Sequence, residues 1–198
     1  MDTFITLPEE RRRLICEEAG NLLGLAPASV EKDFWVCWTL RELFTLPVWG
    51  EQFAFKGGTS LAKGWKLINR FSEDIDIVIS REFLGFPGEK LSNKSRKRLV
   101  KTCSERINNE LLPALAQHFQ RRIPATAKWS LAPAAKEEDP DQQTLLFEYP
   151  RAFNENAAYI QPVVRIEMGA RSATEPVESP ALQPYICEAL RNAIGTGG

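Results

Sequence analysis

Two aspartates, Asp74 and Asp76, open a β-branched apolar stretch that ends at Ile79. This composition predicts a strand, and the alternation of side chains along a strand places both carboxylates on one face. Two strand rises separate their Cα atoms by about 6.5 Å, so their oxygens can converge on one hard cation. Proteins commonly hold Mg²⁺ with one or two carboxylates together with substrate phosphates. The pair therefore predicts a site for Mg²⁺ or Mn²⁺.

A glycine-rich turn precedes the acidic strand and has the properties of a phosphate-binding loop. Gly57 and Gly58 follow a short apolar run, and they permit a sharp turn and a close approach of the backbone to a ligand. Thr59 and Ser60 are typical capping residues, and the free N–H groups at the start of a helix favour phosphate. The predicted nucleotide-binding residues are Gly57, Gly58, Thr59, Ser60, Lys63, Lys66, Arg70 and Ser72.

The turn and the acidic strand have a second interpretation, a simple strand-to-helix turn followed by a solvated strand end. Asp-x-Asp alone favours that interpretation. The ordered combination of phosphate cradle and metal ligands within about twenty residues favours phosphoryl or nucleotidyl transfer.

The segment 56–79, KGGTSLAKGWKLINRFSEDIDIVI, resembles the signature of the AbiEii/AbiGii toxin family of nucleotidyltransferases, in the DNA-polymerase-β-like superfamily. Weaker similarity lies at 30–35 and 165–172. The resemblance implies Mg²⁺-dependent transfer of a nucleotide from an NTP, often to tRNA, by a toxin that is paired with an antitoxin. It also implies a helical C-terminal part that completes the nucleotide site, and we do not recognise that part in this chain.

A second strand is predicted from Tyr159 to Met168, with Val164, Ile166 and Met168 on one face. Superfamily members usually take a third carboxylate from a strand beside Asp-x-Asp, and Glu167 is the best placed candidate. Arg165 lies on the same face, where it either holds phosphate or pairs with a carboxylate. The predicted catalytic and metal-binding residues are therefore Asp74, Asp76 and Glu167.

The resulting expectation is two-metal nucleotidyl transfer by the toxin of a bacterial toxin–antitoxin or phage-defence pair, with tRNA as the acceptor. The alternative is a catalytically incomplete module of the same fold that binds nucleotide or a partner. The unrecognised C-terminal part favours the alternative, whereas the intact turn and carboxylate pair argue against it. A kinase or phosphohydrolase is disfavoured because the sequence has neither a Walker loop nor a kinase catalytic loop.

Two N-terminal helices are predicted to support the site, one over 8–24 and a largely buried one from Pro27 to about Leu46. The aromatic residues of the second helix are expected in the core rather than as base-stacking platforms. Its run Glu31, Lys32 and Asp33 is placed in the first turn, where acidic residues complement the helix dipole. The alternative places Lys32 at the rim of the active site.

A long helical segment is predicted from Asn93 to about Gln120, with a kink or restart at Pro113. Apolar residues from Leu99 to Leu115 keep a four-residue spacing that marks its buried face. The basic residues of its first half indicate either a solvated face or a contact with the backbone of tRNA. They are Lys94, Arg96, Lys97, Arg98 and Lys101.

Composition indicates an ordinary globular chain of 198 residues with a net charge of −1, which excludes a globally basic nucleic-acid binder. We expect an α+β fold, a polymerase-β-like core in which helices pack on a small mixed sheet. The expected divisions are N-terminal helices (1–50), the core (51–170), and a Pro-rich linker and tail (171–198), together one structural domain. A hairpin is predicted from 126–131 and 144–149.

The sequence shows no apolar run of membrane-spanning length and no signal sequence at its start, so a cytoplasmic protein is expected. Its four cysteines are scattered and are joined by only one histidine, His118. Zinc binding is therefore disfavoured, and the thiols are expected to be small buried residues.

Overall fold

The computed structural model describes residues 1–56, 74–88, 91–153, 161–170, 184–187 and 189. Its helices are α1 (Asp2–Thr6), α2 (Glu9–Leu23), α3 (Pro27–Phe44), the 3₁₀ turn η1 (Gly50–Gln52), α5 (Asn93–Arg106), the π-helical turn η3 (Ile107–Leu111) and α6 (Leu112–Gln120). Its strands are β1 (Phe53–Lys56), β2 (Asp74–Ile79), β3 (Ser130–Pro133), β4 (Thr144–Glu148) and β5 (Val163–Gly169).

The strands form one mixed sheet in the order β1-β2-β5-β4-β3. The central pair β2 and β5 is parallel, and each of the other neighbouring pairs is antiparallel. The fold is therefore α+β with a small mixed sheet, as the sequence predicted.

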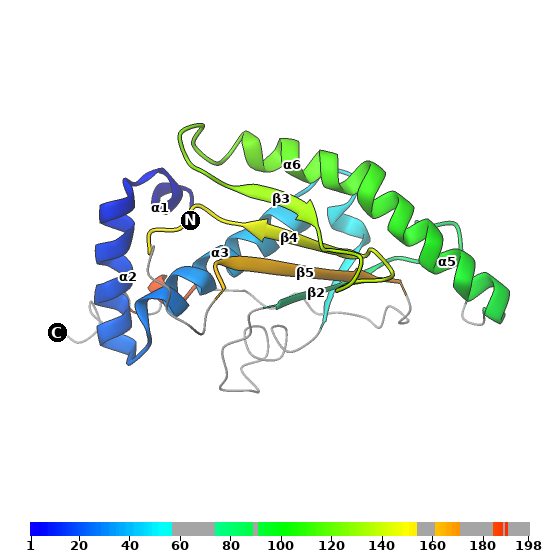
Figure 1. The fold of residues 1–198 in the computed structure, drawn as a ribbon, viewed down its shortest axis with the longest axis horizontal. Helices are drawn as coiled ribbons and strands as arrows, with labels where there is room; N and C mark the ends of the chain where they lie inside the picture. Colours follow the sequence, from blue (N-terminus) through cyan, green and yellow to red (C-terminus); the bar gives the residue numbers. More distant parts are fainter. Residues whose placement is uncertain (57–73, 89–90, 154–160, 171–183, 188, 190–198) are drawn as a thin grey trace.

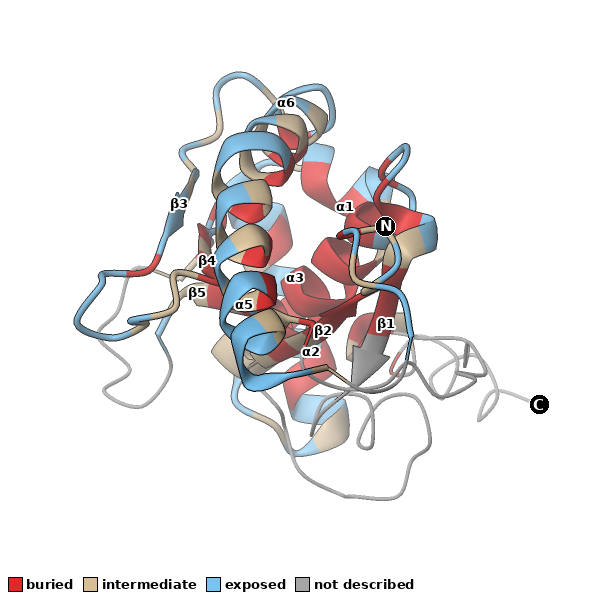
Figure 2. Ribbon diagram, turned by 90° about the vertical axis from the view of Figure 1, so that its right-hand side faces the viewer, coloured by how far each residue is buried: buried red, intermediate tan, exposed pale blue. Residues whose placement is uncertain are grey.

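One face of the sheet carries the core, and the long helices cover it (Figure 1). Figure 2 shows α5 and α6 with their buried surfaces facing inward and their exposed sides turned to solvent, whereas α3 is buried along most of its length. Ile75, Ile77 and Ile79 of β2 are at most 2% exposed, and Val164 and Ile166 of β5 are fully buried. Alternation along the strands sends the intervening residues to the opposite face.

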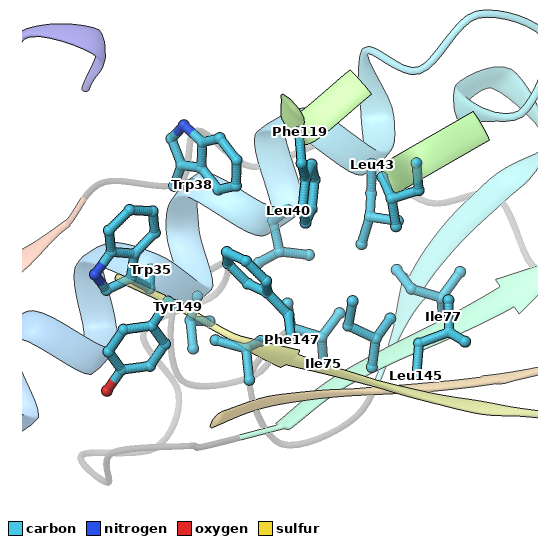
Figure 3. Close-up of a cluster of buried hydrophobic side chains, with 14 of the residues drawn as sticks. Trp35, Trp38, Leu40, Leu43, Ile75, Ile77, Phe119, Leu145, Phe147 and Tyr149 are labelled. Atoms are coloured by element: carbon cyan, nitrogen blue, oxygen red, sulfur yellow. The ribbon is translucent and has the colours of Figure 1, made fainter. Parts of the chain in front are cut away.

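Aromatic side chains join α3 and α6 to the sheet (Figure 3). The ring of Trp38 lies 4.8 Å from that of Phe119 in α6 and 5.8 Å from that of Phe147 in β4. Trp35 stacks on Tyr149 at 5.6 Å. Trp35 and Trp38 are fully buried and Phe34 is 2% exposed, which confirms that these aromatics belong to the core. Phe44, at the end of the helix, is 38% exposed, so the prediction is wrong for it.

Local signals define the ends of α2 correctly. Pro8 occupies its N-cap and Gly24 its C-cap, where a φ of 67° requires the left-handed conformation that glycine adopts without strain. The short helix α1 ahead of Pro8 was not predicted.

The run Glu31–Asp33 differs from the prediction. Because α3 begins at Pro27, these residues fall in its second turn, and each is at most 2% exposed. The carboxylate of Glu31 accepts the N–H of Ala152 at 2.7 Å, and that of Asp33 accepts the N–H of Tyr185 at 2.8 Å. Burial raises the pKa of Glu31 to about 7. These acids anchor distant backbone to α3 and do not complement its dipole.

Pro113 interrupts the long helix as predicted. A proline inside a helix lacks an N–H donor and clashes with the preceding turn, and the chain passes through η3 just before it. The spacing from Leu99 to Leu115 also marks the buried face, since every predicted member is at most 3% exposed: Leu99, Cys103, Ile107, Leu111 and Leu115.

The predicted hairpin forms, but its first strand was placed too early. β3 begins at Ser130 and pairs with β4 in antiparallel register, whereas 126–129 are irregular. Residues 124–127 form a turn in which the N–H of Ala127 donates to the carbonyl of Pro124 at 2.9 Å. Because the chain turns here, the strand begins only at Ser130.

The cysteines are free thiols; Cys16, Cys37 and Cys103 are buried as expected, whereas Cys187 is only partly buried. Among the described helices, none is long and apolar enough to cross a membrane.

Candidate active site

The two aspartates lie on the face of β2 that points away from the helices. Asp74 and Asp76 are partly buried, and they alternate with Ile75 and Ile77, which are fully or almost fully buried in the core. The strand thus presents its apolar side chains to the core on one face and its carboxylates on the other. The prediction that both aspartates lie on one face of a strand is confirmed.

The parallel pairing of β2 with β5 brings the third carboxylate to the same place. Asp76 lies opposite Glu167, and Asp74 lies opposite Arg165. Directly opposed residues of neighbouring strands share a face, with Cβ atoms about 5 Å apart. The structure therefore assembles Asp74, Asp76, Arg165 and Glu167 as two adjacent rows on one surface.

The carboxylates of this surface interact unfavourably with one another. Partial burial raises the pKa of Asp76 above its usual range, and the negative charges of Glu167 and Asp74 raise it further. A divalent cation between these groups would relieve the repulsion.

Arg165 supplies the compensating positive charge. Its Nε donates to Oε1 of Glu167 at 2.9 Å, and its Nη1 lies 3.5 Å from Oε2 of Glu138. Of the two possibilities left open for Arg165, pairing with a carboxylate is the one that the structure shows. The contact with Glu138 was not predicted from the sequence.

The donor set fits a magnesium site built mainly on the two aspartates. Among the described residues, no group of three His, Cys, Asp or Glu side chains has the arrangement of a metal centre. The ion pair with Arg165 is consistent with this, since it already occupies one carboxylate oxygen of Glu167. Asp74 and Asp76 would hold Mg²⁺ together with substrate phosphates, and Glu167 would join them after leaving Arg165.

The predicted nucleotide-binding residues all lie outside the described residues: Gly57, Gly58, Thr59, Ser60, Lys63, Lys66, Arg70 and Ser72. Lys32, the alternative candidate for the rim of the site, is 2% exposed. It lies in α3, which packs on the core face of the sheet (Figure 1), so it forms no exposed rim.

The basic side chains of α5 belong to the helical layer. All five predicted tRNA contacts, Lys94, Arg96, Lys97, Arg98 and Lys101, are exposed. Lys101 pairs with Glu105 at 3.6 Å, a contact of little energetic weight at this exposure.

The α+β fold, with an Asp-x-Asp strand and a neighbouring strand that adds a third carboxylate, is consistent with a nucleotidyltransferase. The family model "Nucleotidyl transferase AbiEii toxin, Type IV TA system" matches residues 38–194. The chain therefore belongs to the AbiEii family, which confirms the resemblance seen in the sequence. No curated protein and no solved structure matches it.

Proposed function

We propose that this protein is a Mg²⁺-dependent nucleotidyltransferase that moves a nucleotide from an NTP to tRNA, as the toxin of a type IV toxin–antitoxin pair. The observation that carries the proposal is the register of β2 and β5, which sets Asp74, Asp76 and Glu167 on one surface. Membership of the AbiEii family supports the toxin role and an antitoxin partner. The cytoplasm, where NTP and tRNA occur, is the proposed compartment.

The carboxylates have distinct roles in the proposed reaction. Asp74 and Asp76 would hold Mg²⁺ or Mn²⁺, which when bound would neutralise charge on the NTP phosphates. In the transfer the acceptor hydroxyl attacks the α-phosphorus, and pyrophosphate is the leaving group. Glu167 completes the site and helps to accept the proton of the acceptor hydroxyl. Since Arg165 pairs with Glu167, it is a positioning residue that can alternatively move to a phosphate.

The turn at 57–60 is proposed to cradle the β- and γ-phosphates, with Lys63, Lys66 and Arg70 offsetting their charge and Ser72 bonding in the same cleft. The exposed bases of α5 are proposed to contact the backbone of the tRNA body.

A second candidate function is nucleotide or partner binding without transfer. The observation that favours it is the ion pair between Arg165 and Glu167, which occupies the third carboxylate.

The test is label transfer from each α-labelled NTP to total tRNA in the presence of Mg²⁺. Asp74→Asn/Asp76→Asn should reduce labelling at least about 100-fold, because the cation loses both aspartate ligands. The matched control is Glu137→Gln/Glu10→Gln, which neutralises two exposed acids outside the site and should retain full labelling.

Two outcomes would contradict the proposal. Full labelling by the double aspartate variant would remove the carboxylates from the mechanism. Mg²⁺-dependent NTP binding without any transfer would leave the binding-only function.

A further inference from the structure

A stripe along one side of α2 is apolar over most of its length and faces solvent. Leu14 and Leu22 are each 55% exposed, and Leu7 and Ile15, which are partly buried, continue the same stripe. Contiguous exposed apolar side chains of this kind mark an interaction surface. With two charged residues they line one shallow hollow, and the six members of this α2 stripe are Leu7, Arg11, Leu14, Ile15, Glu18 and Leu22.

The members of the α2 stripe share one side of the helix. Counted from Leu7, the others follow after 4, 7, 8, 11 and 15 positions, a spacing at which helical side chains fall within an arc of about 100°. Figure 1 shows α2 at one end of the molecule and α5 at the other. A partner on the stripe therefore lies away from the basic residues of α5.

The two charges of the stripe have no counter-charge within their own helix. Arg11 and Glu18 are exposed, and the residues three and four positions from each of them are uncharged. Those are the positions at which side chains of one helix meet. Glu9, by contrast, pairs with Arg13 four positions later at 3.5 Å. Arg11 and Glu18 can therefore pair with groups outside α2.

The order of residues along the stripe is complementary to itself when it is reversed. Arg11 lies three positions before Leu14, and Glu18 lies three positions after Ile15. Leu7 lies seven positions before Leu14, and Leu22 lies seven positions after Ile15. Every member thus has a counterpart at the same distance from the midpoint between Leu14 and Ile15.

A two-fold axis through that midpoint makes each contact favourable. It sets Arg11 against Glu18 of a second copy, and it sets leucine or isoleucine against leucine at the other positions. Two helices that pack antiparallel along their length have this geometry. A parallel pairing of the same stripes would instead oppose Arg11 to Arg11 and Glu18 to Glu18, which is repulsive.

We infer that the α2 stripe is the interface of a symmetric homodimer, in which α2 packs antiparallel on α2 of a second copy. The apolar side chains supply affinity, and the two pairs of Arg11 with Glu18 fix direction and register. Because one pair of 15-residue helices is a small interface, the dimer should depend on concentration. The stripe lies outside residues 38–194, which match the AbiEii family model, so the inference does not rest on the proposed function.

The experiment is sedimentation velocity at low salt, in which the wild-type chain should convert from monomer to dimer between about 1 and about 200 μM. Arg11→Glu and Glu18→Arg should each weaken self-association at least about tenfold, because each turns two attractions across the interface into repulsions. Circular dichroism checks that the helices of each variant remain folded. The matched controls, Lys136→Glu and Glu137→Arg at exposed positions outside the stripe, should alter self-association less than about twofold.

Combining the two changes tests the direction of the pairing. Arg11→Glu/Glu18→Arg in one chain exchanges the charges and should restore the dimer to within about threefold of the wild-type affinity, because each pair attracts again. An equimolar mixture of the two single variants should also form dimers, although neither variant does so alone. One variant then carries two negative charges on the stripe, and the other carries two positive charges.

Each outcome decides for or against the antiparallel dimer. A wild-type chain that stays monomeric over the whole range overturns the inference and leaves the stripe to a different protein. Single variants that dimerise like the wild type also overturn it, because the interface then lies elsewhere. Loss of the dimer in both single variants without recovery in the double variant rejects the antiparallel register. Recovery in the double variant and in the mixture supports the inference, whether or not the protein transfers nucleotides.

Discussion

At the scale of single residues, the fold places carboxylates close together at a partly buried site, where their negative charges repel one another. Asp76 sits on a strand whose other face is buried, next to two more carboxylates, and its pKa is raised by burial, by Glu167 and by Asp74. Raising the folded-state pKa above its unfolded value means that ionisation of Asp76 near neutral pH destabilises the fold. The site therefore stores unfavourable electrostatic energy that a divalent cation can release.

We predict that Mg²⁺ raises the melting temperature of the wild-type protein by a few degrees, because a cation that binds only the folded state stabilises it. Asp76→Asn should remove this increase. Without Mg²⁺ the variant should melt at no lower temperature than the wild type, because it removes the repulsion between Asp76 and the carboxylates of Asp74 and Glu167. Differential scanning fluorimetry over a Mg²⁺ titration at pH 7.5 measures both effects. The control Glu137→Gln, at an exposed acid, should respond to Mg²⁺ like the wild type; an equal response from Asp76→Asn would place the cation elsewhere.

At the scale of the elements, a buried carboxylate connects α3 to the end of α6. Glu42 is fully buried. Its Oε2 contacts Nε2 of His118 at 2.8 Å and Nε of Arg122 at 2.9 Å, and its Oε1 contacts Nη2 of Arg41 at 2.7 Å. These contacts hold the helical layer in the position that buries the core face of the sheet, and so they support the opposite, carboxylate-bearing face.

We predict that Glu42→Gln destabilises the protein by about 3 kcal/mol, because Arg122 loses its buried counter-charge and Arg41 keeps only its contact with Asp2. The matched variant is Glu110→Gln, whose carboxylate pairs with Arg106 at 3.0 Å within one helical segment and is 52% exposed. That change should cost no more than about 0.5 kcal/mol. Urea unfolding measures the free energy of unfolding of both variants. Equal losses of stability would show that burial does not make the contacts of Glu42 stronger than those of Glu110.

At the scale of the whole molecule, one hydrophobic cluster joins the N-terminal helices to the sheet and to the described residues near the C-terminus. It extends from Phe4 in α1 through Trp35 and Ile166 to Ile186. Buried polar contacts reinforce it, since Glu31 and Asp33 of α3 bind the backbone at Ala152 and Tyr185. We therefore propose that the predicted divisions 1–50 and 51–170 fold as one unit.

The corresponding prediction is a single unfolding transition. Tryptophan fluorescence, which reports on Trp35 and Trp38 in the core, and far-UV circular dichroism, which reports on all helices, should have the same urea midpoint. A separate early transition in the circular dichroism alone would show that the N-terminal helices unfold independently.

Much of this description follows from local patterns in the sequence. Side-chain direction along a strand has a fixed period of two, so alternation alone places Asp74 and Asp76 on one face of their strand. It likewise places Glu167 on the face of its strand that does not carry Val164 and Ile166. Pro8, Gly24 and Pro113 mark helix boundaries through backbone constraints that act within a turn. The dense motif at 56–79 also sufficed to identify the family, which the match over residues 38–194 confirms.

Other features depend on which segments meet. The family resemblance predicted the strand of Glu167 beside that of Asp76, but not their parallel direction or their register, since this pairing joins residues about ninety positions apart. The burial of Glu31 and the pairing of Arg165 with Glu138 likewise arise from long-range packing. Local propensity determines what each segment can become, but charges and cavities acquire their chemistry only from the neighbours that the tertiary structure supplies.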